Sequence, residues 1–171
     1  MFKRVGFFVI VASFFFIFIT VVRAETTGTV TATVTAQNIS VSVDNGDGVD
    51  FGTIGVGSTA NTTTAGVNDS TTATNNGNVI EDFSVKADDS TNWNLAATAG
   101  SEDYTMQYCV TTCDSSPVWA DVGISPSYVE FDDTVSVSGT SVFDLQVGTP
   151  TSTTEYGEQT ITVTVLATLH S

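Results

Sequence analysis

The segment TGTVTATVTAQNISVSV, residues 27–43, decides the fold class that this sequence predicts. Valine and alanine alternate with threonine over 29–36, where the apolar residues have even numbers. The alternation resumes over 39–43, where the apolar residues have odd numbers. A period of two residues is typical of a β-strand with one buried face. The change of parity at Gln37-Asn38 predicts a β-bulge or a strand that crosses from one sheet to another.

Short alternating stretches recur through the rest of the chain and are separated by turn-rich segments. The clearest of them are residues 79–87, 92–98, 103–110, 141–147 and 160–168. The second and third of these are expected to form a hairpin through the short connection between them. Regularly spaced short strands without helices are typical of sandwiches. The sequence therefore predicts an all-β fold, an Ig-like antiparallel β-sandwich of about nine strands.

The first 24 residues, MFKRVGFFVIVASFFFIFITVVRA, have the organisation of a secretory signal peptide. Lys3 and Arg4 precede an apolar run over 5–22, and cleavage is expected after Ala24. An uncleaved membrane anchor is the alternative, because about 18 apolar residues can span a bilayer. Residues 25–171 then form a single domain of ordinary size, and the protein is expected to be secreted or held at the cell surface.

The chain that follows the predicted signal peptide is strongly acidic. Three of the four Lys and Arg residues lie in the signal peptide, whereas all 19 Asp and Glu residues lie after it. Lys86 is therefore the only Lys or Arg of the mature chain, which carries a formal charge of −18. Nucleic acid is excluded as a partner because phosphate binding needs clustered Lys and Arg. Membrane contact is expected only through the signal segment before cleavage, while divalent cations and basic proteins are electrostatically compatible partners.

Two motifs resemble a pattern of bacterial surface proteins. VDFGTIGVGS at 49–58 and NNGN at 75–78 resemble the FGxxxVGS…NxGN run of exported Ig-like β-sandwiches of the Hydin/ASH-like kind. Trp93 and Leu95, in NWNLAAT, resemble the strand of WxL-type surface proteins, although a second such motif near the C-terminus is missing. The resemblance implies a Thr-rich exported protein with a sandwich fold, and it implies no catalytic residue.

Cys109 and Cys113 are the only cysteines and lie four residues apart in YCVTTCDSSP. In an exported chain, two nearby cysteines are expected to form a disulfide. Their C-x3-C spacing differs from the C-x-x-C of thiol oxidoreductases, and two cysteines with one distant histidine do not make a zinc site. We therefore expect a structural disulfide at the tip of a hairpin.

Three aspartates, Asp44, Asp47 and Asp50, lie close together in the sequence. The first two belong to the acidic loop DNGDG, and Asp50 follows Val49 directly after it. An EF-type calcium loop needs oxygen ligands at positions 1, 3 and 5 and an acid at position 12. The best alignment leaves Val43 at position 1 and an isoleucine at position 12. We interpret the loop as a hairpin turn, because Asn-Gly and Asp-Gly tolerate positive φ. No firm metal site or cofactor is expected, and calcium bound by the three aspartates is the alternative.

Catalytic residues are not evident in this sequence. His170 is the only histidine and is next to last, so any Ser-His-Asp or Cys-His mechanism would have to use it. Adjacent acids that could support glycoside hydrolysis are expected to be solvated. These pairs are Glu81/Asp82, Asp88/Asp89 and Asp132/Asp133. The protein is predicted not to be an enzyme, and a secreted hydrolase is the least favoured function.

The expected function is that of a structural protein of the cell surface or extracellular matrix, with surface proteins or copies of itself as partners. In one version, residues 25–36 complete a neighbouring sheet by strand donation. The alternative is an extracellular carbohydrate- or protein-binding module that uses exposed aromatic residues. Candidates for such contacts are Trp93, Trp119 and Tyr128.

Overall fold

The computed structural model describes residues 27–44, 48–63 and 70–171. The predicted signal peptide and Asp47 lie outside this part of the chain. The described residues form eleven strands and no helix. The strands are β1 (Val41–Asp44), β2 (Thr59–Asn61), β3 (Thr71–Asn75), β4 (Glu81–Ala87), β5 (Asn94–Leu95), β6 (Asp103–Cys109), β7 (Ala120–Asp121), β8 (Gly123–Ile124), β9 (Val129–Val135), β10 (Thr140–Gly148) and β11 (Val163–Leu169).

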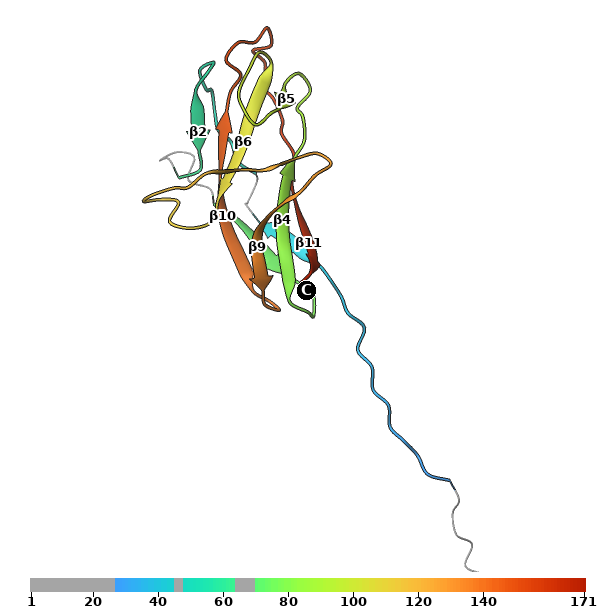
Figure 1. Cartoon of the computed structure of the whole chain (residues 1–171). Helices are drawn as coiled ribbons and strands as arrows, with labels where there is room; N and C mark the ends of the chain where they lie inside the picture. The colour runs from blue at the N-terminus through green and yellow to red at the C-terminus, as the bar shows by residue number, and fades with distance from the viewer. Residues whose placement is uncertain (1–26, 45–47, 64–69) are drawn as a thin grey trace, which may run out of the picture. The chain divides into compact units, whose positions relative to one another are not determined.

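The strands form two sheets. The larger one has the order β1-β3-β10-β6-β5, with β2 paired to β10 and β7 paired to β6. The smaller one has the order β11-β4-β8, with β9 also paired to β4. Figure 1 shows β9, β4 and β11 side by side. The predicted all-β sandwich is confirmed, with eleven strands in the described residues where about nine were expected; β5, β7 and β8 are strands of only two residues each.

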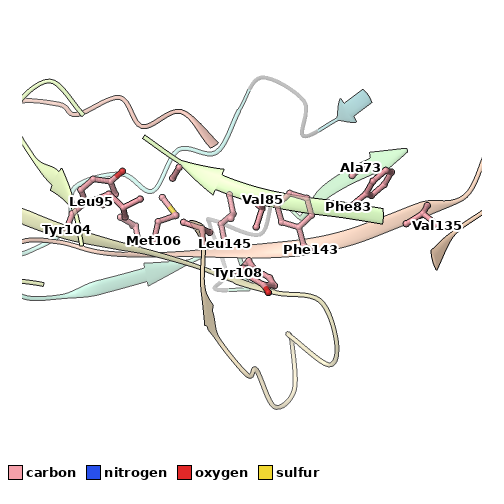
Figure 2. Close-up of a cluster of buried hydrophobic side chains, with 13 residues drawn as sticks. Ala73, Phe83, Val85, Leu95, Tyr104, Met106, Tyr108, Val135, Phe143 and Leu145 are labelled. Carbon is pink, nitrogen blue, oxygen red and sulfur yellow. The ribbon is translucent and has the colours of Figure 1, made fainter. Parts of the chain in front are cut away.

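The core lies between the two sheets. Figure 2 shows buried side chains strung along the sandwich, from Leu95 and Tyr104 near one end to Phe83 and Val135 near the other. In β4 the residues alternate between buried and half-buried along its whole length. The buried residues therefore recur every second position, as the alternation in the sequence predicted, because successive side chains of a strand point to opposite faces.

Two local pairings differ from the sequence predictions. The strands β5 and β6 pair in parallel, with Asn94 opposite Asp103, so the connection between them is not a hairpin. The strand β1 pairs with β3 rather than with residues 49–51, which form no strand. Val49 and Phe51 are nevertheless half-buried against the core. Alternation placed these residues on a buried face but did not identify their partners.

The chain divides into two units, residues 1–35 and 36–171. The second unit contains both sheets. In the first unit, the described residues 27–35 form no strand, although their sequence alternates like one. Among the described residues, no helix is long and apolar enough to cross a membrane.

Candidate functional site: strand edges and a polar anchor

The N-terminal segment, residues 27–35, exposes apolar side chains that strand formation would cover. Val30 is 93% exposed and Val34 is 97% exposed. Every residue from 27 to 35 is exposed, and the segment contains no charged residue. Val30, Ala32 and Val34 would share one face of a strand, with threonines on the other. The segment therefore has the alternating sequence of a half-buried strand, but its apolar side chains are exposed.

A polar anchor, residues 75–81, holds the chain that follows this segment. The Asn78 side-chain amide donates to the carbonyl of Ala36 over 2.8 Å, and its Oδ1 accepts from Asn38 N over 2.8 Å. The backbone N–H of Asn78 also donates to Asn38 O, and Asn76 N donates to Ser40 O over 2.7 Å. These bonds extend the pairing of β1 with β3 towards the N-terminus. They hold residues 36–40 against the connection between β3 and β4.

Asn75 organises the interior of the polar anchor. Its side chain is fully buried and its Nδ2 donates to the carbonyls of Val79 and Val135, over 2.8 Å and 2.9 Å. Its Oδ1 accepts from Gly77 N over 2.8 Å. Asn75 thereby links the end of β3, the β3–β4 connection and the end of β9. A buried amide is stabilising only when its polar atoms are paired in this way.

Glu81, the first residue of β4, is the fully buried carboxylate of the anchor. Its Oε1 accepts from Ser40 N over 2.8 Å, while its Oε2 has no hydrogen-bond partner among the described residues. A Cβ on Gly77 would collide with Glu81 Oε1 and with the carbonyl of Asn38. Glycine is therefore required at position 77. The NNGN motif was visible in the sequence, but Glu81 was expected to be solvated, so that prediction was wrong for this member of its acidic pair.

One edge of the smaller sheet is open. Asp88 N donates to Thr162 O, and His170 N donates to Ile80 O, each over 3.1 Å. In an antiparallel ladder the bonded residues alternate, so the even-numbered residues of β11 bond to β4. The odd-numbered residues, Val163 to Leu169, direct their N–H and C=O groups away from β4. In the described part of the chain, β11 pairs with no other strand.

Cys109 and Cys113 form the predicted disulfide, with Cα atoms 5.8 Å apart. Cys109 ends β6, and Cys113 lies in the connection to β7, which pairs antiparallel with β6. Both cysteines are buried. The disulfide is therefore positioned to close a connection between adjacent strands, as its spacing predicted.

The described residues form no calcium site from the three candidate aspartates. Asp50 Oδ1 accepts from Gly52 N over 2.8 Å, which closes a turn, and Asp44 ends β1 opposite Thr72. The third candidate, Asp47, lies outside the described residues. Among the described residues, no group of three or more His, Cys, Asp or Glu side chains could hold a metal ion.

The other titratable side chains considered for catalysis form separate local contacts and do not meet at one site. His170 Nδ1 lies 2.7 Å from Asp82 Oδ1 at the end of β11. Lys86 Nζ donates to Asp88 Oδ1 over 2.7 Å, and this hydrogen bond lowers the pKa of Asp88 and raises that of Lys86. Asp89 instead accepts from a backbone N–H, that of Leu95. Asp82, Asp88 and Asp89 are thus engaged in local structure.

The three candidate aromatic residues are all half-buried. Trp93 Nε1 donates to Thr153 Oγ1 over 3.1 Å and packs against the core. The Lys86 ammonium lies 5.6 Å from the centre of the Tyr128 ring, within reach of a cation–π contact. Trp119 precedes β7. Each ring is therefore partly committed to the fold of its own chain.

Comparisons with protein-family models, with curated proteins and with solved structures each found no match to this chain.

Proposed function

We propose that this protein is an exported, non-enzymatic structural subunit of the cell surface or extracellular matrix, which assembles with copies of itself through residues 27–35. The observation that carries this proposal is the exposure of Val30 and Val34 in a segment with strand-like alternation. Leaving large apolar side chains in water forgoes about 1.5–3 kcal/mol for each valine-sized side chain that could be buried. Pairing with a partner would recover part of that free energy.

Three further features favour this proposal over a catalytic one. The predicted signal peptide and the disulfide suit an oxidising exterior. The resemblance to Hydin/ASH-like surface domains, carried by residues 49–58 and 75–78, points to the same compartment. Among the acids that could act on a substrate, Asp82 is hydrogen-bonded to His170, Asp88 to Lys86 and Asp89 to the backbone N–H of Leu95.

Assembly is tested with the mature chain, residues 25–171, by electron microscopy and sedimentation velocity. The formal charge of −18 repels like copies, so the measurement is made at about 0.15 M and 1 M salt, where charge repulsion is progressively screened. Filaments or discrete oligomers are expected, and calcium is added in a parallel series. A chain that stays monomeric at every concentration, with and without calcium, contradicts the proposal.

An extracellular carbohydrate- or protein-binding module is the second candidate. The partial exposure of Trp119 and Tyr128 favours it, because aromatic faces are common contacts in binding sites. A glycan array probed with the mature chain and with Trp119→Ala separates the two candidates. Specific binding that Trp119→Ala removes, from a chain that never assembles, would favour the module.

A further inference from the structure

We propose that the acceptor for the N-terminal segment is the open edge of β11, Val163–Leu169, in a second copy of this chain. This inference rests on the proposed function and names the surface that the donated segment would meet. Residues 27–35 would add a strand beside β11, outside β4, and so extend the smaller sheet from four strands to five.

The backbone of β11 offers a complete ladder for an added strand. Its register with β4 runs without interruption from Val163 opposite Ala87 to Leu169 opposite Glu81. The alternate residues therefore present unpaired N–H and C=O groups at regular spacing along the free edge. The nine residues of 27–35 are long enough to cover the seven residues of β11.

The side chains of the two segments match in pattern. Val163, Val165 and Ala167 point inwards and pack against the core, but they are only partly buried. Val30, Ala32 and Val34 would continue this apolar face, while the threonines between them face solvent. The added strand would cover both sets of apolar side chains.

Charge and edge protection single out β11 among the strand edges of the described structure. Neither β11 nor residues 27–35 carry a charged residue, so the contact brings no acids together in a chain with a large negative charge. Natural edges are commonly protected by charge, proline, bulges or short length. The edge strand β9 is acidic and irregular in register, β1 carries Asp44, β5 has only two residues, and β11 has none of these protections.

The test uses two full-length mature variants, each of which disables one half of the contact. Val30→Asp/Val34→Asp places charges on the inward face of the segment and leaves β11 intact. Ala167→Pro removes an outward N–H from β11 and leaves the segment intact, since proline is tolerated at edge strands where that N–H faces out. Each variant alone should be monomeric at concentrations where the wild type assembles. An equal mixture should form a heterodimer and stop there.

A matched control distinguishes the effect of charge on the inward face of the segment from the effect of added charge in general. Thr31→Asp/Thr33→Asp adds the same charge to the outward face of the segment and should still assemble. Native folding of each variant is checked by near-UV circular dichroism and by its unfolding midpoint. If Ala167→Pro does not fold, Leu169→Pro at the exposed end of β11 replaces it and should weaken assembly at least tenfold.

The outcomes distinguish this inference from the proposed function. If folded Ala167→Pro assembles like the wild type while Val30→Asp/Val34→Asp does not, the segment is the donor but β11 is not its acceptor. That result overturns this inference alone. If the wild type never assembles, or if residues 27–35 are protected from amide exchange in a monomer, both proposals fail. If Thr31→Asp/Thr33→Asp loses assembly as fully as Val30→Asp/Val34→Asp does, the valine face is not the one that meets the acceptor.

Discussion

The two edges of the smaller sheet, β9 and β11, flank the same central strand and differ in the properties that control strand pairing. The strand β9 carries Glu130, Asp132 and Asp133, and its register with β4 shifts twice. The strand β11 is uncharged and keeps one register with β4 over all seven residues. Charges and register shifts disfavour the addition of a further strand, whereas a flat uncharged edge favours it.

The two edges are also held by different contacts. Phe131 of β9 lies 6.1 Å from Phe83, 5.9 Å from Tyr108 and 5.1 Å from Phe143, measured between ring centres. The strand β11 has no aromatic residue and depends on its ladder and on three small apolar side chains. An irregular edge is thus secured by packing, and a regular edge by hydrogen bonds that leave its outer side available.

Removing the aromatic contact of β9 is expected to have the largest effect on stability. Phe131→Ala should lower the free energy of unfolding by about 3 kcal/mol, because it empties a site between three rings. The control Val129→Ala, on the same strand and 39% exposed, should cost below about 1 kcal/mol. Urea unfolding measures both. Equal losses would show that Phe131 is not what secures β9.

The end of β4 where both edges meet is the next most sensitive place. Glu81 lies opposite Leu169 of β11 and Val135 of β9, and Gly77 packs against its carboxylate. Gly77→Ala should cost about 2 kcal/mol, because the added methyl group overpacks the polar anchor. Gly157→Ala is the matched control, since its added methyl group meets no neighbouring atom. Thermal unfolding of the two variants at the same midpoint would contradict the role of Gly77.

Amide hydrogen exchange should resolve the open side of β11 residue by residue. In the monomer, the amides of Thr164, Leu166 and Thr168 should exchange about tenfold or more slowly than those of Val165 and Ala167, since only the first three bond to β4. The latter two should gain protection when the chain assembles. Uniform protection along β11 in the monomer would show that its outer edge is already covered.

The smallest expected effect concerns the loop that leads into β11. Hydrogen bonds from the Thr153 hydroxyl and, next, the Thr154 backbone N–H lower the pKa of Glu102 below its ordinary 4.5. The folded state therefore binds this proton less readily than the unfolded state, and the stability gained is present above pH 4.5. It is lost as the pH falls through the lower pKa of the folded state.

Glu102→Gln should therefore be slightly less stable than the wild type at pH 7 and equally stable below the folded pKa of Glu102. Urea unfolding at several pH values measures this difference. Glu158→Gln removes the same charge from an exposed residue of the loop that leads into β11 and serves as the control. A difference for Glu102→Gln that stays constant with pH would contradict a role for its carboxylate.

The alternation in the sequence predicted the face of many residues but not the partner of their strands. In β4, Phe83 and Val85 are buried as their alternation indicated. The same reasoning predicted a hairpin between β5 and β6, which instead pair in parallel. Periodicity is a property of consecutive residues, whereas pairing depends on segments distant in the sequence.

The candidate site was predictable to a similar extent. The strand-like character of residues 27–35 and the NNGN motif at 75–78 were both visible in the sequence. The burial of Glu81 was not, because an acid next to Asp82 is ordinarily solvated. Among the described residues, it is Ser40 N, 41 residues away in the sequence, that gives one of the Glu81 oxygens a partner.

The sequence by itself determined that this chain is all-β and that Cys109 and Cys113 form a disulfide, because alternation and cysteine spacing act over a few residues. Tertiary structure alone decided which strands became edges and which side of β11 stayed open. Those outcomes depend on where β4 lies relative to β9 and β11, strands that are more than 40 residues from it in the sequence. The free edge of a sheet is set by the strands that are absent from it, and no local pattern encodes that absence.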